Sequence, residues 1–165
     1  MFLDEALPGD TFNLNMHAFA RMATPIFPIM DNLYMDTFFF AVPYRLVWEN
    51  WEKFNGYQVN PGDSTDYVIP QMSPMTVTEG SIYDYFGIPT NTPNDIQFNS
   101  LHFRAYNLIW NDWFRHEDLQ DSVAVNLTDA DDNPTDYTLL KRGKRYDYFT
   151  SCLPYPQKGP DVTLP

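Results

Sequence analysis

Fourteen prolines are scattered along the 165 residues, and they limit the length of any regular element. Proline has no backbone N–H to donate, so it interrupts helices and is excluded from the interior of a sheet. Average usage is only about 5% of residues. The chain is therefore predicted to consist of short helices and strands joined by long, stiffened connections. Repeated helical units and one long bundle are disfavoured.

Two segments carry strand patterns. From Thr11 to Ala18 apolar and polar residues alternate strictly, which indicates a half-buried strand. Pro8-Gly9-Asp10, just before it, predicts a turn. Residues 33–42 are apolar on both faces apart from Asp36 and Thr37, which is typical of a strand covered on both sides. Shorter candidate strands are Val123–Leu127, Tyr137–Leu140 and Tyr146–Leu153.

Two other segments have helical spacing. Segment 43–54 begins with proline, carries apolar residues at i, i+4 and i+7, and is followed by Asn55-Gly56, which ends helices. The second helix is predicted from about Ser100 to Arg115, where five large apolar residues form a stripe. Four or five strands are too few to close a barrel or a sandwich. The fold class is therefore mainly β with inserted helices, and residues 1–165 form one partial domain with long loops.

The formal net charge is −12, so the surface as a whole repels nucleic acid, and any contact with DNA must be local. The single Cys152 excludes an internal disulfide framework, and we expect it to be a buried small hydrophobe. No apolar run approaches the ~20 residues of a membrane span. Aromatic residues make up 17% of the chain and argue against disorder.

No catalytic, metal or cofactor site is predicted. The carboxylates form no recognisable acid/base pair, and His17, His102 and His116 lack the spacing of metal ligands. We expect His102 to be a packing or surface residue. The loop 128–136 matches the first ligand positions of a calcium loop, but it departs from that pattern later, so we expect a solvated acidic hairpin tip.

The informative cluster is basic. It packs four of the ten positive charges into five residues around Gly143, and aromatic residues follow at once. Cations beside rings suit single-stranded nucleic acid, because charge attracts phosphate and rings stack on bases. The alternative is a basic loop that pairs with the excess acid of the protein itself. The candidate nucleic-acid contacts are Lys141, Arg142, Lys144, Arg145 and Tyr146.

Several ordered blocks together resemble one family. They include Asp4-Glu5-Ala6-Leu7-Pro8-Gly9-Asp10-Thr11-Phe12, Ala18-Phe19-Ala20-Arg21-Met22-Ala23-Thr24-Pro25, Trp48-Glu49-Asn50-Trp51, Phe103-Arg104-Ala105-Tyr106-Asn107-Leu108-Ile109-Trp110-Asn111 and Asp147-Tyr148-Phe149-Thr150-Ser151-Cys152-Leu153-Pro154. These blocks look like the major capsid protein of microviruses, small phages with single-stranded DNA, in the gokushovirus branch. The resemblance covers nearly the whole chain, and the loop 128–136 matches least well.

The resemblance implies an eight-stranded jelly roll with inserted loops, of which this chain would be a part, since members of the family are several times longer. It implies a structural protein, not an enzyme, that assembles with copies of itself into an icosahedral virion in the bacterial cytoplasm. The implied partners are packaged single-stranded DNA and phage accessory proteins, with no membrane. The alternative from another class is a carbohydrate-binding or glycoside-cleaving β-domain, suggested by exposed rings near carboxylates.

Overall fold

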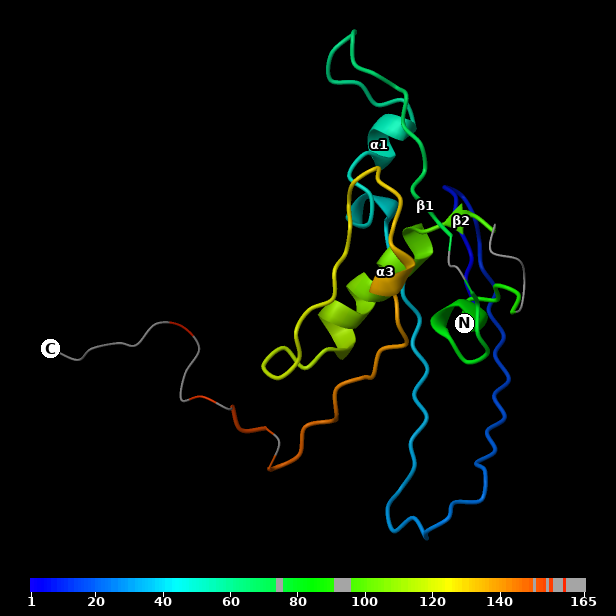
Figure 1. Ribbon diagram of the computed structural model, residues 1–165, viewed down its shortest axis with the longest axis vertical. Coiled ribbons are helices and arrows are strands. Elements are labelled where there is room, and N and C mark those ends of the chain that lie inside the picture. The colour runs from blue at the N-terminus through cyan, green and yellow to red at the C-terminus, as the bar shows by residue number, and fades with distance from the viewer. Residues whose placement is uncertain (74–75, 91–95, 150, 154, 156–158, 160–165) are drawn as a thin grey trace, which may run out of the picture. The chain divides into compact units, whose positions relative to one another are not determined.

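The computed structural model describes residues 1–73, 76–90, 96–149, 151–153, 155 and 159. The chain divides into two units, Met1–Phe40 and Ala41–Pro165, and each is described by itself (Figure 1). The prediction of one partial domain over 1–165 remains a prediction.

The first unit is an extended chain that runs out and back, with bends at residues 26–27 and 31 (Figure 1). All forty of its residues are described; every one is exposed, and none is assigned to a helix or a strand. The predicted turn is present, because Gly9 has φ 95° and the amide of Asp10 donates to the carbonyl of Leu7 over 3.1 Å. The predicted strands at 11–18 and 33–42 are not assigned as strands, and all of their residues are exposed except Val42, which is partly buried.

The second unit contains all the regular elements, which are η1 (Tyr44–Leu46), α1 (Trp51–Phe54), β1 (Gln71–Met72), α2 (Ile82–Tyr85), β2 (Phe98–Asn99), α3 (Leu101–Ile109), the π-helical turn η2 (Trp110–Phe114) and η3 (Pro134–Asp136). Strands β1 and β2 pair antiparallel, with Gln71 opposite Asn99 and Met72 opposite Phe98. This two-stranded sheet does not test the expected jelly roll, which stays a prediction. Within the described ranges, no helix is both long enough and apolar enough to cross a membrane.

The second predicted helix is confirmed, since α3 and η2 together run from Leu101 to Phe114. The first predicted helix is broken into η1 and α1. Between them the amide of Glu49 donates to the carbonyl of Leu127 over 3.0 Å, so it is bonded to a distant loop and not to a helical carbonyl. Gly56, with φ 93°, follows the end of α1 as expected.

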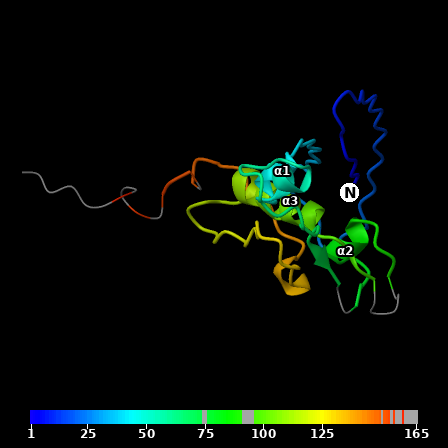
Figure 2. The same ribbon diagram turned by 90° about the horizontal axis from the view of Figure 1, so that it is seen from above.

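Helix α3 lies between two hydrophobic clusters, with α1 near one side and α2 near the other (Figure 2). On the α2 side Phe86 stacks on Phe103 with ring centroids 4.2 Å apart. On the α1 side Trp48 and Leu101 are almost fully buried. Burial of both sides of α3 makes this helix the centre of the unit.

Side-chain amides of α3 and η2 hold the segment 123–127 where a strand was predicted. Asn111 donates to the carbonyl of Val123 over 2.8 Å and accepts from its amide over 3.0 Å. Asn107 donates to the carbonyl of Ala124 over 3.0 Å. These bonds replace a strand partner. No strand is assigned in the described parts of 123–127, 137–140 and 146–153, and Thr150 lies outside the described residues.

The expectation for Cys152 is wrong, because its side chain is exposed. No described residue of 147–155 belongs to either hydrophobic cluster, and the described residues next to Cys152 are exposed as well.

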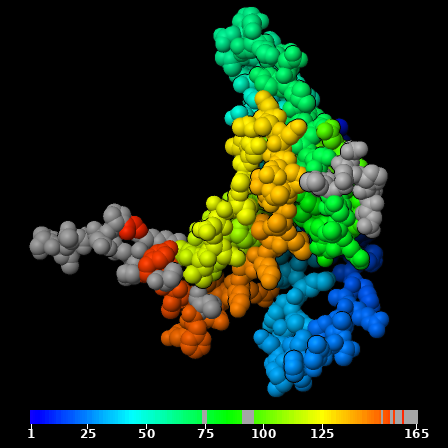
Figure 3. Space-filling model, viewed as in Figure 1, coloured from blue at the N-terminus to red at the C-terminus, as the bar shows by residue number. Residues whose placement is uncertain are grey.

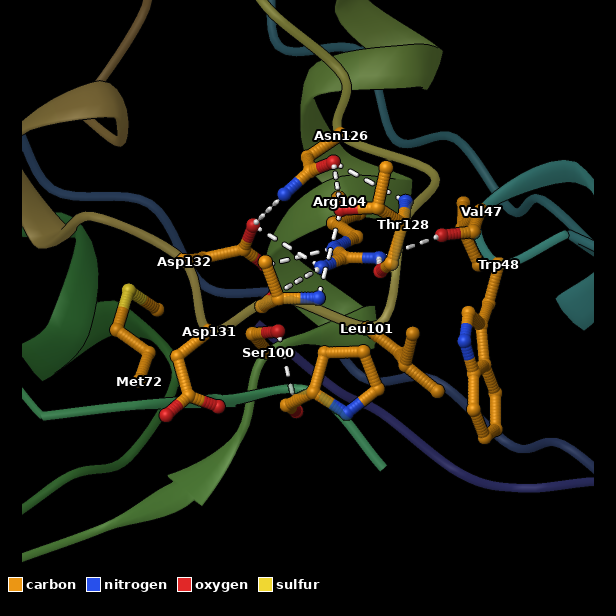
Figure 4. A network of polar contacts seen from close by, with 12 residues as sticks. Val47, Trp48, Met72, Ser100, Leu101, Arg104, Asn126, Thr128, Asp131 and Asp132 are labelled. Atoms are coloured by element: carbon orange, nitrogen blue, oxygen red, sulfur yellow. Dashed lines mark hydrogen bonds and ion pairs between the residues drawn. The ribbon is translucent and has the colours of Figure 1, made fainter. Parts of the chain in front are cut away.

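A buried arginine joins three distant segments (Figure 4). Arg104, on α3, is 0% exposed and donates five hydrogen bonds of 2.6–3.2 Å, which matches the five N–H donors of a guanidinium. Two go to the carboxylate of Asp132, and the others go to the carbonyls of Val47, Thr128 and Ala130. The fully paired charge avoids the desolvation penalty of an unpaired one.

The expectation of a solvated acidic tip at 128–136 holds only in part: Asp129, Asp131 and Asp136 are exposed, but Asp132 is buried. Asp129 accepts hydrogen bonds from the indole of Trp48 (2.6 Å) and the amide of Asn50 (2.8 Å). Asp131 accepts from the backbone amide of Gln71 over 3.0 Å. These side chains hold the loop against the unit. Among the residues that the structure describes, no group of three or more His, Cys, Asp or Glu could hold a metal ion.

Candidate nucleic-acid interface

The basic cluster lies in a cleft formed where the end of η2 meets the loop 141–146. The cleft has a volume of about 190 Å³. Its lining comes from two stretches, Trp113–His116 and Arg142–Tyr146. In the space-filling view the chain after residue 137 (orange) runs beside the end of this helical region (yellow-green) (Figure 3). Residues 26 or more apart in sequence thus line one cleft.

Two hydrogen bonds fix the loop on the helical region. The indole of Trp110 donates to the carbonyl of Lys141 over 3.0 Å. Two residues on, the amide of Gly143 donates to the carbonyl of Phe114 over 2.7 Å. A Cβ on Gly143 would lie 3.1 Å from that carbonyl oxygen and 3.3 Å from the amide nitrogen of His116. A larger residue would therefore push the two backbones apart by a few tenths of an ångström, and glycine allows their close approach.

The cleft concentrates positive charge in an acidic chain. Its described lining holds Arg115, Arg142, Lys144 and Arg145, which are four of the ten Lys and Arg residues, and no Asp or Glu. The guanidinium of Arg142 lies over the ring of Phe114, 5.8 Å from its centroid, which is the geometry of a cation–π contact. A local site of this kind can attract phosphate although the net charge is −12.

Aromatic rings accompany the cations. The exposed ring of Tyr146 (65% exposed) contacts the imidazole of His116 at an interplanar angle of 55°, with centroids 5.2 Å apart. Trp113 is also exposed, at 71%. Exposed rings beside cations provide the stacking surface that unpaired bases use. Both ring nitrogens of His116 and the Nε of Arg115 are buried and have no hydrogen-bond partner among the described residues.

Four of the five predicted contact residues are brought together here, and the fifth is not. Arg142, Lys144, Arg145 and Tyr146 line the cleft, whereas Lys141 is exposed outside the lining and is held by its carbonyl. Sequence reasoning missed the other wall, Trp113–His116. The signal available was modest: two rings of the helical stripe followed at once by Arg115 and His116.

A family model described as capsid protein (F protein) matches residues 1–165, the whole chain. The chain belongs to this capsid protein family. The resemblance to microvirus capsid proteins inferred from the sequence blocks is thereby confirmed.

Three curated capsid proteins VP1 are similar to the chain. It is 56% identical to that of Bdellovibrio phage phiMH2K over 167 residues, which cover 100% of the chain. The identity is 43% over 190 residues for Chlamydia phage 1, covering 99% of the chain, and 38% over 174 residues for Spiroplasma virus 4, covering 95%. In each case the match spans 31% of the relative's length, so the chain corresponds to about a third of a capsid protein.

Proposed function

We propose that the chain is one part of a structural capsid polypeptide that assembles with copies of itself into an icosahedral virion around single-stranded DNA. The observation that carries this proposal is the family match over residues 1–165. Assembly in the bacterial cytoplasm and contact with phage accessory proteins belong to the same proposal. The chain would act as a shell component and would need no enzymatic activity.

Exposed apolar side chains support the assembly part of the proposal. In the first unit Phe19, Ile26 and Met30 are each more than 90% exposed. Contiguous exposed apolar surface on a protein marks a place where another protein surface binds. We propose that further strands of the same polypeptide and neighbouring copies cover these residues, and that the whole forms a jelly roll.

The cleft supports the DNA part of the proposal. Cations for phosphate and exposed rings for bases occur together there, and the described lining is free of carboxylates. Lys141, Arg142, Lys144, Arg145 and Tyr146 are the proposed contacts, with Lys141 contributing charge from outside the cleft. Loss of one phosphate contact should lower the slope of log affinity against log salt by roughly 0.7 for a single strand.

The test replaces Arg142 and Lys144 by glutamine in the complete capsid polypeptide. Shells should still assemble, as seen by electron microscopy, but they should release DNA at lower salt than the parent shells. A matched control, Arg45→Gln with Lys53→Gln, removes the same charge from exposed positions outside the cleft. Equal DNA retention by the cleft pair and the control pair would refute the DNA contact. Failure of the complete polypeptide to form shells under any condition would refute the assembly proposal.

A further inference from the structure

The cleft contains polar atoms that no other described residue satisfies. The Nδ1 and Nε2 of His116 and the Nε of Arg115 are buried without a hydrogen-bond partner among the described residues. Burial of such groups destabilises a fold unless a partner is supplied. Three such atoms on adjacent residues, in the wall of one cleft, indicate a place built for a ligand.

Gln120 holds the backbone of His116 and one terminal nitrogen of Arg115 in place. The amide of His116 donates to the side-chain oxygen of Gln120 over 2.8 Å, and the Nη1 of Arg115 donates to the Gln120 carbonyl over 2.9 Å. These two bonds to Gln120 do not use the Nε of Arg115 or the imidazole nitrogens of His116, so those atoms can bind another partner. The volume of about 190 Å³ is far above the ~10–15 Å³ that a single water needs.

The chemistry of the lining selects an anion with several acceptor oxygens. The Nε of arginine only donates, and a neutral imidazole has one N–H donor in either tautomer. The described lining adds three further cations and no carboxylate. A phosphate group accepts several charge-assisted hydrogen bonds at once, which suits this arrangement.

We propose that the cleft is a phosphate-binding pocket in which Arg115 Nε and His116 donate to one phosphate of the packaged single strand. In this proposal the phosphate displaces the ring of Tyr146, which is tilted by 55° against the imidazole, and an adjacent base stacks on that exposed ring. This inference rests on the proposed DNA contact and deepens it, because it assigns a specific hydrogen-bonding site and not only an attractive surface.

The test uses two variants of the complete capsid polypeptide that keep the net charge. His116→Phe keeps a ring against Tyr146 and removes both nitrogens, and Arg115→Lys keeps the positive charge and removes Nε. Binding of a fluorescein-labelled oligo-dT is measured by anisotropy at several NaCl concentrations. Each variant should bind about tenfold more weakly or worse, because hydrogen bonds to a charged group are lost. The salt slope should stay the same, because the number of cations is unchanged.

Matched controls are His102→Phe and Arg45→Lys, the same chemical changes outside the cleft; each should bind within about twofold of the parent. Parent-like binding by His116→Phe and Arg115→Lys, with weakened binding by the Arg142 and Lys144 pair, would overturn this inference and leave the DNA contact standing. Parent-like binding by all cleft variants would overturn both. If His116→Phe does not assemble, the result for Arg115→Lys decides whether the phosphate site exists. A further variant, His116→Gln, should keep part of the oligo-dT binding through its side-chain N–H.

Discussion

The amide of Gly143 lies 2.7 Å from the carbonyl oxygen of Phe114 and donates a hydrogen bond to it across 29 residues of sequence. This bond places the basic loop against the end of η2 and brings the two walls of the cleft together. The cleft depends on it, because neither wall alone combines the four cations with the buried nitrogens of His116.

Replacing Gly143 by alanine should loosen the loop. The added Cβ would lie 3.1 Å from the Phe114 oxygen, so the backbones must separate and the 2.7 Å bond must lengthen. We expect a loss of about 1–3 kcal/mol of stability and weaker oligo-dT binding. Hydrogen exchange at the residue 143 amide should be faster than in the parent. The control is Gly62→Ala, where an added Cβ meets nothing within 4 Å; equal effects of the two changes would contradict the prediction.

Replacing Arg104 by methionine should destabilise the complete polypeptide by about 3–5 kcal/mol, because the carboxylate of buried Asp132 loses its ionic partner. Urea unfolding would measure this loss. The double change Arg104→Met with Asp132→Leu should recover a large part of it, since no unpaired charge then remains. Exposed Arg45→Met is the control, with an expected effect within about 0.5 kcal/mol. A near-zero effect at Arg104 would mean that the network does not hold the unit.

Stability should fall at alkaline pH through Tyr83. Burial, with a smaller contribution from the charge of Asp136, raises the pKa of Tyr83 to about 12. The ordinary value of about 10 applies when the chain is unfolded. Because the pKa of Tyr83 is higher in the folded state, Tyr83 contributes its full stabilisation below about pH 10. This stabilisation is lost as the pH rises through about 12.

In Tyr83→Phe the decline of melting temperature between these pH values should be shallower. The variant should also be less stable at neutral pH, since the hydroxyl donates to the carbonyl of Pro134 over 2.6 Å. Burial also raises the pKa of Tyr137, so some decline should persist. Tyr148→Phe, at a ring that is 88% exposed, is the control. If the melting temperature of Tyr83→Phe falls with pH as steeply as that of the parent, Tyr83 is not the group responsible for the alkaline loss of stability.

Replacing Asn111 by aspartate should release the segment 123–127. The aspartate keeps the acceptor for the Val123 amide but loses the donor to its carbonyl, which Asn111 reaches over 2.8 Å. We expect a loss of about 1–3 kcal/mol, since a partly buried carbonyl is left unpaired beside a carboxylate. Amide exchange at Val125 would report the release. Exposed Asn55→Asp is the control, and slower or unchanged exchange in Asn111→Asp would contradict the prediction.

Features that local sequence determines could be predicted. The apolar stripe identified the helical region 101–114, and Gly9 and Gly56 marked turns that require positive φ. The basic loop was visible because its charges are adjacent in sequence. Each of these signals lies within about fifteen residues, where helix spacing and backbone sterics act directly.

Long-range pairings could not be predicted in the same way. No local sequence pattern indicates that Arg104 binds Asp132, or that His116 lies in the same cleft as Tyr146. Alternation at 11–18 correctly indicated an extended chain, but burial of a strand depends on a partner elsewhere. At 123–127 the partner is the amides of Asn107 and Asn111, which no strand pattern encodes.

The five bonds of Arg104 also bear on how the chain folds as it is made. Asp132 is synthesised 28 residues after Arg104, so the guanidinium leaves the ribosome before its carboxylate partner. Until then, packing α3 between its two clusters would bury an uncompensated charge, which costs several kcal/mol. We expect a nascent chain stalled before residue 132 to hold α3 unpacked. Emergence of residues 126–132 would then let this unit close in a single late step.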